Sequence, residues 1–62
     1  MKRYMIVEVN TYGYHNALFF SAEDLDEAED YGDAAAALDF VSHVELYGYQ
    51  TDKGYWLIRR WK

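Results

Sequence analysis

Hydrophobic and polar residues alternate near the start of the sequence, over residues 3–11 (RYMIVEVNT). This period of two predicts a β-strand that is buried on one face and exposed on the other. We expect the buried face to consist of Met5, Val7 and Val9. The opposite, open face then carries Tyr4, Ile6, Glu8 and Asn10.

A turn and a second strand follow directly. Residues 12–14 (YGY) predict a short turn, because Gly13 can adopt a positive φ angle at no steric cost. Residues 15–20 (HNALFF) predict the returning strand. Its core-facing side chains are either Ala17 and Phe19 or Leu18 and Phe20, and the sequence leaves both sets open.

The period of two returns at Ser42 and predicts a second pair of strands. In the first of these, Val44 and Leu46 are expected to point inward, and the other face carries His43, Glu45, Tyr47 and Tyr49. A polar loop at residues 50–54 (QTDKG) leads to the last strand, residues 55–61 (YWLIRRW). One side of that strand is expected to carry Tyr55, Leu57, Arg59 and Trp61, and the other side Trp56, Ile58 and Arg60.

Between the two strand pairs, residues 21–41 (SAEDLDEAEDYGDAAAALDFV) form the helical part of the chain. Ser21 is expected to cap the helix, because its side chain can accept hydrogen bonds from backbone N–H groups of the first turn. At about 100° per residue, Leu25, Ala28 and Gly32 share one side of the helix, and acidic residues cover the opposite side.

Gly32 and Asp33 predict an interruption of this helix. Glycine is the residue most often found just after a helix end, and Asp is a favourable N-cap for a following segment. We therefore expect a kink or break at Gly32–Asp33 and a second short helical segment over residues 34–40.

Together these elements predict a single α+β domain, residues 1–62, with a four-stranded antiparallel sheet in ββαββ order and the kinked or broken helical segment packed on one face. The second face of the sheet would be left open and aromatic, with Tyr4, Ile6, Tyr47 and Tyr49 on it, together with one side of the last strand. That face is expected either to receive a partner or to be covered by loops and by the Tyr rings themselves.

Composition narrows the class of protein. The chain is 52% hydrophobic and 19% aromatic, with seven Tyr and no Cys, so aromatic packing has to replace disulfides as a source of stability. The start of the sequence lacks the long apolar run of a signal peptide, and no stretch is long and apolar enough to span a membrane. We expect a cytoplasmic protein.

Charge is strongly segregated along the chain, which has a net charge of −5. Seven acids fall within residues 23–33 of the helical stretch: Glu23, Asp24, Asp26, Glu27, Glu29, Asp30 and Asp33. Pairs such as Glu23–Glu27 are like-charge i,i+4 neighbours and repel each other. The acids are either a solvated surface or a surface for binding a basic partner.

Sequence signals for catalysis are weak. Ser21 and Ser42 could pair with His15 or His43, but no nucleophile turn surrounds either serine, and His43 with Glu45 supplies two metal ligands at most. The glycines form no phosphate-binding loop. We therefore expect no enzymatic activity, no metal and no cofactor.

A basic, aromatic edge is a separate possibility. All six cations lie near the ends of the sequence: Lys2, Arg3, Lys53, Arg59, Arg60 and Lys62. With Trp61, the terminal cations could bind single-stranded nucleic acid by charge and stacking. The net negative charge opposes this, and the same cations could instead pair with the acidic residues.

The layout resembles the small phage-encoded inhibitors, notably the anti-CRISPR proteins. The resemblance is carried by the strand YMIVEV (residues 4–9), the helix start SAEDLDEA (residues 21–28) and the last strand YWLIRRW (residues 55–61). It implies a non-enzymatic protein of an infected bacterial cell's cytoplasm that binds a host effector complex and blocks its DNA-binding channel.

Two hypotheses follow. In the first, the seven acids replace phosphates and dock onto a Lys/Arg-lined channel of a nucleic-acid-binding protein, with no direct contact to nucleic acid and no membrane. In the second, the chain is a protein–protein interaction module or homodimer that uses its aromatic sheet face, with Tyr47, Tyr49 and Tyr4 as the interface. Either a monomer or a homodimer is compatible with the sequence.

Overall fold

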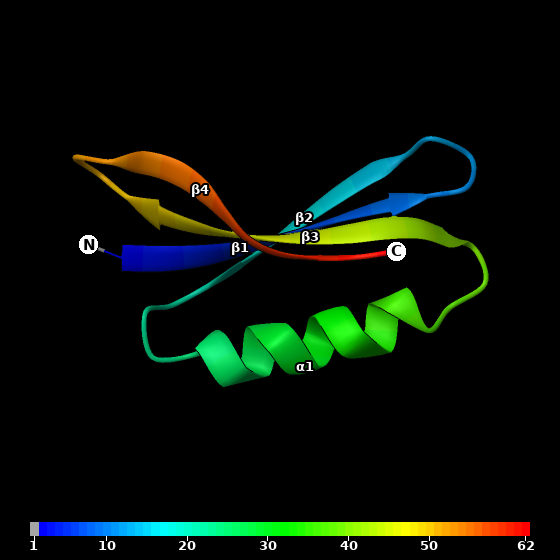
Figure 1. Ribbon diagram of the computed structural model, residues 1–62, viewed down its shortest axis with the longest axis horizontal. Helices are drawn as coiled ribbons and strands as arrows, with labels where there is room; N and C mark the ends of the chain where they lie inside the picture. The colour runs from blue at the N-terminus through cyan, green and yellow to red at the C-terminus, as the bar shows by residue number, and fades with distance from the viewer. Residues whose placement is uncertain (1) are drawn as a thin grey trace.

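Four antiparallel strands form one sheet in the order β2-β1-β3-β4, and a helix crosses one of its faces (Figure 1). The computed structural model describes residues 2–62. The elements in chain order are β1 (Lys2–Asn10), β2 (His15–Phe20), α1 (Leu25–Ala36), β3 (Val41–Gln50) and β4 (Gly54–Trp61). The predicted α+β fold and its ββαββ order are confirmed.

Asn10 organises the turn between β1 and β2. Its Oδ1 atom accepts hydrogen bonds from the backbone N–H groups of Tyr12, at 2.9 Å, and of Tyr14, at 3.0 Å. Gly13 adopts a φ angle of 91°, which non-glycine residues rarely populate. The Asn10 side chain thus accepts hydrogen bonds from backbone N–H groups that a tight turn would otherwise leave without a partner.

The first strand presents the opposite face to the helix from the one predicted. Tyr4 and Ile6 are 4% and 0% exposed and belong to the core, whereas Met5 and Val7 lie half-buried on the other face. Of the three residues predicted to be buried, only Val9 is, at 7% exposed. Both sides of β1 are apolar, so alternation alone could not assign them. Pairing with β3 decides the matter, because Ile6 lies opposite Leu46, which is fully buried as expected.

The open question about β2 is settled by its register with β1. Leu18 lies opposite Ile6 and Phe20 lies opposite Tyr4, so this pair faces the helix. Directly opposed residues of paired strands share a face. Ala17 and Phe19 therefore point to the open face.

The helix is not interrupted at Gly32–Asp33, contrary to the prediction, and runs continuously from Leu25 to Ala36. Gly32 is buried inside it, where a Cβ atom would overlap the Trp61 ring. Glycine is therefore needed here for close approach of the ring to the helix backbone, and not to end the helix.

The helix also begins later than predicted. Asp24 is the N-cap residue, and its side chain makes no capping hydrogen bond. Ser21 lies in the preceding turn, where its hydroxyl donates to Asp24 Oδ2 at 2.7 Å. Ser21 therefore stabilises the turn that leads into the helix and does not cap it.

A bulge divides the last strand. Leu46 pairs with Arg59 and Tyr47 pairs with Leu57, so Ile58 is an extra residue in β4. The predicted grouping of Tyr55, Leu57, Arg59 and Trp61 on one side is therefore wrong: the first two point to the open face, and the last two point to the helix.

The core lies between the helix and the covered face of the sheet. Its buried members are Tyr4, Ile6, Ala28, Ala35, Val41, Val44, Leu46 and Trp61. Small residues on the helix let it approach the sheet closely, and the large side chains come from the strands.

Candidate binding surfaces

The seven acids predicted as one partner-binding set do not share one environment. Glu23, Asp26, Glu27 and Asp30 are exposed around the outer side of the helix and its N-terminal turn. No ion pair joins these four carboxylates to any side chain described within residues 3–62. Asp24 instead accepts the hydrogen bond from Ser21.

Glu29 and Asp33 attach the helix to β4. The Arg59 guanidinium lies 3.3 Å from Asp33 Oδ1 and 3.8 Å from Glu29 Oε1. The Trp61 indole N–H donates to Asp33 Oδ1 at 2.7 Å, and Arg59 lies 4.4 Å from the centroid of the Trp61 ring. We call this arrangement of four side chains the β4 lock. Glu29 and Asp33 thus already have a cationic partner within the chain, while their side chains remain 36% and 57% exposed.

The basic C-terminal residues are likewise engaged within the fold. Trp61 is 9% exposed, so its ring cannot stack on a base. Lys62 Nζ donates to the backbone oxygens of Leu38 and Val41, both at 3.0 Å, beyond the end of the helix. Arg59 faces the helix and Arg60 faces the open side, opposite Glu45. The structure does not gather them into a basic, aromatic edge.

The second face of the sheet carries a broad apolar surface. Across the strands, Phe19 lies beside Met5, Met5 beside Tyr47, and Tyr47 beside Leu57, with Tyr49 and Tyr55 in the next row. We call these six residues the aromatic sheet face. Phe19, Tyr55 and Leu57 are 63%, 55% and 52% exposed. The helix lies on the other side of the sheet (Figure 1).

Tyr4 does not belong to this surface, although it was predicted to join Tyr47 and Tyr49. It lies opposite Gly48 on the helix-facing side and is buried in the core. The prediction assigned the two faces of β1 the wrong way round and therefore placed Tyr4 on the open face. Met5 takes its place as the neighbour of Tyr47 on the open side.

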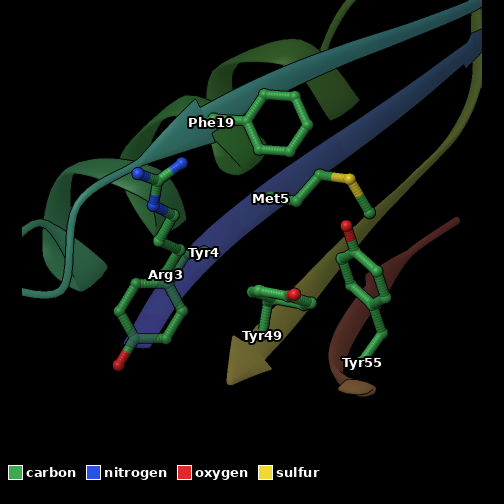
Figure 2. A pocket seen from close by; sticks show the side chains of 6 residues that line it. All are labelled: Arg3, Tyr4, Met5, Phe19, Tyr49 and Tyr55. Atoms are coloured by element: carbon green, nitrogen blue, oxygen red, sulfur yellow. The ribbon is translucent and has the colours of Figure 1, made fainter. Parts of the chain in front are cut away.

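A hollow of about 190 Å³ marks one end of the aromatic sheet face. Figure 2 shows Phe19, Met5, Tyr49 and Tyr55 arranged around it on neighbouring strands. The rings of Tyr49 and Tyr55 are tilted against each other with centroids 4.6 Å apart, so they form one wall. Arg3 also lines the hollow and brings a cation to its edge.

Two tyrosines have raised pKa values: Tyr31 of helix α1 and Tyr47 on the open face of the sheet. Burial is the main reason that the pKa of Tyr31 is raised, and the Glu8 carboxylate adds to it, with the Tyr31 hydroxyl donating to Glu8 Oε1 at 3.3 Å. Burial is also the main cause of the raised pKa of Tyr47. The charge and hydrogen bond of Glu45 raise this pKa further, whereas the charge of Arg60 lowers it. Both hydroxyls thus hold their protons more tightly than a free tyrosine.

The two possible metal ligands of β3 lie near each other. His43 Nε2 lies 3.9 Å from Glu45 Oε1, as their shared face predicted, but no third His, Asp or Glu of residues 2–62 joins them in a metal-binding group. Over the same residues, no helix has the length and apolar character to cross a membrane.

Comparison with known proteins identifies no relative. No family model matches the chain, and the searches of curated proteins and of solved structures likewise find no match. Function is therefore inferred from the surfaces of the chain itself.

Sequence reasoning named only two of the six residues of the aromatic sheet face. Tyr47 and Tyr49 were predicted there, together with one unspecified side of the last strand, but Met5 and Phe19 were not assigned to it. One of the two alternatives left open for residues 15–20 did place Phe19, together with Ala17, on the open face. The positions of Tyr55 and Leu57 depend on the bulge at Ile58, which no residue type in β4 announces.

Proposed function

We propose that this protein is a non-enzymatic, protein-binding module and that the aromatic sheet face is its binding surface. One observation carries the proposal. Phe19, Tyr55 and Leu57 are each more than half exposed on a sheet face that no helix of residues 2–62 covers, and Phe19 and Tyr55 line a hollow in it. Contiguous apolar surface of this kind on a small protein usually marks an interaction site.

The residue types suit protein recognition. Tyr and Met are enriched at protein interfaces, because they offer large contact areas, and tyrosine adds a hydroxyl for hydrogen bonding. Arg3 borders the hollow at one end, and Arg60 projects from the open face at the other side of the surface. The fitting partner is a protein with an apolar patch bordered by acidic groups.

The test is a binding assay with matched variants. Leu57→Ser and Tyr55→Ser remove exposed apolar groups from the aromatic sheet face, whereas Leu38→Ser removes a 42% exposed leucine beyond the helix end. Partners captured from bacterial lysate are identified by mass spectrometry and titrated against each purified variant. Loss of binding with the first two variants and retention with Leu38→Ser is expected. Equal binding by all of them would refute the proposal.

A second candidate function is favoured by the four free carboxylates on the helix. Glu23, Asp26, Glu27 and Asp30 face outward, with no described cation beside them. They could dock onto a Lys/Arg-lined nucleic-acid channel, as an inhibitor of the anti-CRISPR type would. Such binding is electrostatic and should weaken steeply with salt.

The two candidates are separated by one further variant. Changing Glu23, Asp26, Glu27 and Asp30 to Lys should abolish binding if the acids carry the contact, and should leave it intact if the aromatic sheet face does. Titration of the same partner at low and at moderate salt gives an independent measure of the electrostatic contribution.

A further inference from the structure

The outer edge of β2 is unprotected. β2 is a terminal strand of the sheet, and its sequence, HNALFF, contains no Asp, Glu, Lys, Arg or Pro. Natural proteins usually block such an edge with charge, with proline or with a bulge, because free backbone groups pair readily with another strand. β4, at the opposite edge, has two arginines and the bulge at Ile58.

Backbone hydrogen bonding identifies the free groups of β2. The Asn10 N–H donates to the Tyr14 oxygen at 3.0 Å, so Asn10 directs its backbone N–H toward the β2 side of β1. In an antiparallel ladder, hydrogen-bonded pairs alternate along the strands. Asn16, Leu18 and Phe20 therefore direct their backbone groups to β1. His15, Ala17 and Phe19 direct theirs away from the sheet.

We propose that this edge binds a second copy of the chain, with β2 pairing antiparallel to β2 across a two-fold axis at Ala17. This edge adjoins the surface of the proposed function and shares Phe19 with it, but the contact is made mainly by backbone groups of β2. In this register Ala17 faces Ala17 of the second copy, and His15 faces its Phe19. Each free N–H and C=O then has a partner, which gives about six backbone hydrogen bonds, two for each facing pair.

Side chains and charge favour a second copy over an unrelated strand. Phe19, 63% exposed, gains an aromatic cross-strand neighbour in His15 of the second copy. Tyr14, 72% exposed, comes opposite Phe20 of that copy on the helix side. Although the chain has a net charge of −5, no acid lies in β2, so the contact itself brings no like charges together.

The resulting assembly would be a continuous eight-stranded sheet with both helices on one side. The two aromatic sheet faces would adjoin on the other side, with Phe19 of each copy near the junction. A contact made through one edge buries less surface than a standard stable interface. Dimerisation is therefore expected to be reversible, with a dissociation constant in the micromolar range or weaker.

Sedimentation measurements on wild type and edge variants test the proposal. Ala17→Pro removes an outward N–H while leaving the bonds to β1 in place, which an edge strand tolerates. It should weaken dimerisation by roughly tenfold or more, because two bonds at the axis are lost. Leu57→Lys adds a cation to the aromatic sheet face and serves as the control. It should leave dimerisation unchanged.

A charge swap tests the register and guards against misfolding of the proline variant. Ala17→Lys and Ala17→Glu each place like charges at the axis and should be monomeric alone, whereas an equal mixture should form a heterodimer. A wild-type chain that stays monomeric up to about 1 mM would overturn the proposal. So would a dimer that Leu57→Lys disrupts and the Ala17 variants leave intact.

Discussion

Large apolar side chains occur on both faces of the sheet, but the two faces hold them differently. On the helix-covered face, Ile6, Val44 and Leu46 are completely buried. They pack in one core with residues from distant parts of the sequence. On the open face, Phe19 and Leu57 are more than half exposed and have only neighbouring strands beside them within the sheet. Similar residue types therefore serve folding on one face and are available for recognition on the other.

Polar contacts show the same division. The β4 lock joins the helix to the last strand, because Asp33 contacts Arg59 and Trp61, which lie more than twenty residues further along the chain. On the open face, the polar pair of His43 and Glu45 lies within one strand. A contact inside a single strand restricts the chain little, whereas one between a helix and a strand determines how they pack. Substitutions on the covered face should accordingly change stability most.

The largest effect is expected for Trp61→Ala. Removing a buried tryptophan costs about 3–5 kcal/mol, which is most of the stability that a small domain has. Urea unfolding followed by circular dichroism gives the free energy of unfolding. Leu57→Ala on the open face is the matched control and should cost less than about 1 kcal/mol. Similar losses from the two variants would remove the distinction between the faces.

Gly32→Ala should come next, with a loss of about 1–3 kcal/mol, because the new methyl group would overlap the Trp61 ring. The loss should occur even though alanine favours a helix by about 1 kcal/mol over glycine. In a Trp61→Leu background the same change should be stabilising. If Gly32→Ala stabilises the wild-type chain, Gly32 is not held by close packing.

Asp33→Ala removes the acceptor of the Trp61 indole N–H and one partner of Arg59. We expect a loss of about 1–2 kcal/mol. Asp30→Ala, three residues earlier and exposed, should change stability by about 0.5 kcal/mol or less. Comparing the two unfolding curves, together with the shift in tryptophan fluorescence, measures the lock directly. Equal effects would mean that the lock adds no stability.

The smallest effect is expected at alkaline pH, and it involves Tyr31 of the helix and Tyr47 of the open sheet face. The pKa of Tyr31 and of Tyr47 is raised above the ordinary value of 10.0, so the folded chain holds these protons better than the unfolded chain. Their contribution to stability is complete below about pH 10 and is lost as pH rises through the raised pKa. Unfolding of Tyr31→Phe and Tyr47→Phe at several alkaline pH values should show a flatter decline than wild type. A decline of unchanged steepness would contradict the assignment.

Much of the fold was predictable from the sequence because it depends on local pattern. The strands and the helix were located from periods of two and of about 3.6 residues, and Val44 and Leu46 were correctly assigned to the core. The faces of β1 were not predictable, because Met5, Val7, Tyr4 and Ile6 are all apolar or aromatic. Only pairing with β3 distinguishes them.

Gly32 illustrates a second limit. A glycine that ends a helix and a glycine that admits a ring have the same local sequence signal, and the ring here comes from Trp61. The candidate surfaces met the same limit. Tyr47 and Tyr49 were predicted from alternation alone, whereas recognising that Asp33 is engaged required knowing that Arg59 and Trp61 lie beneath the helix.

The β4 lock has a consequence for the order of folding. Arg59 and Trp61 hold a helix that precedes them by more than twenty residues, and Lys62 binds the carbonyl groups that follow that helix. A short helix with like-charged neighbours is unstable alone in water. Helix α1 is therefore not expected to persist until Arg59 and Trp61 are in place. Its lasting attachment to the sheet has to await the arrival of β4, so hairpin formation at residues 41–61 is expected to limit the rate of folding.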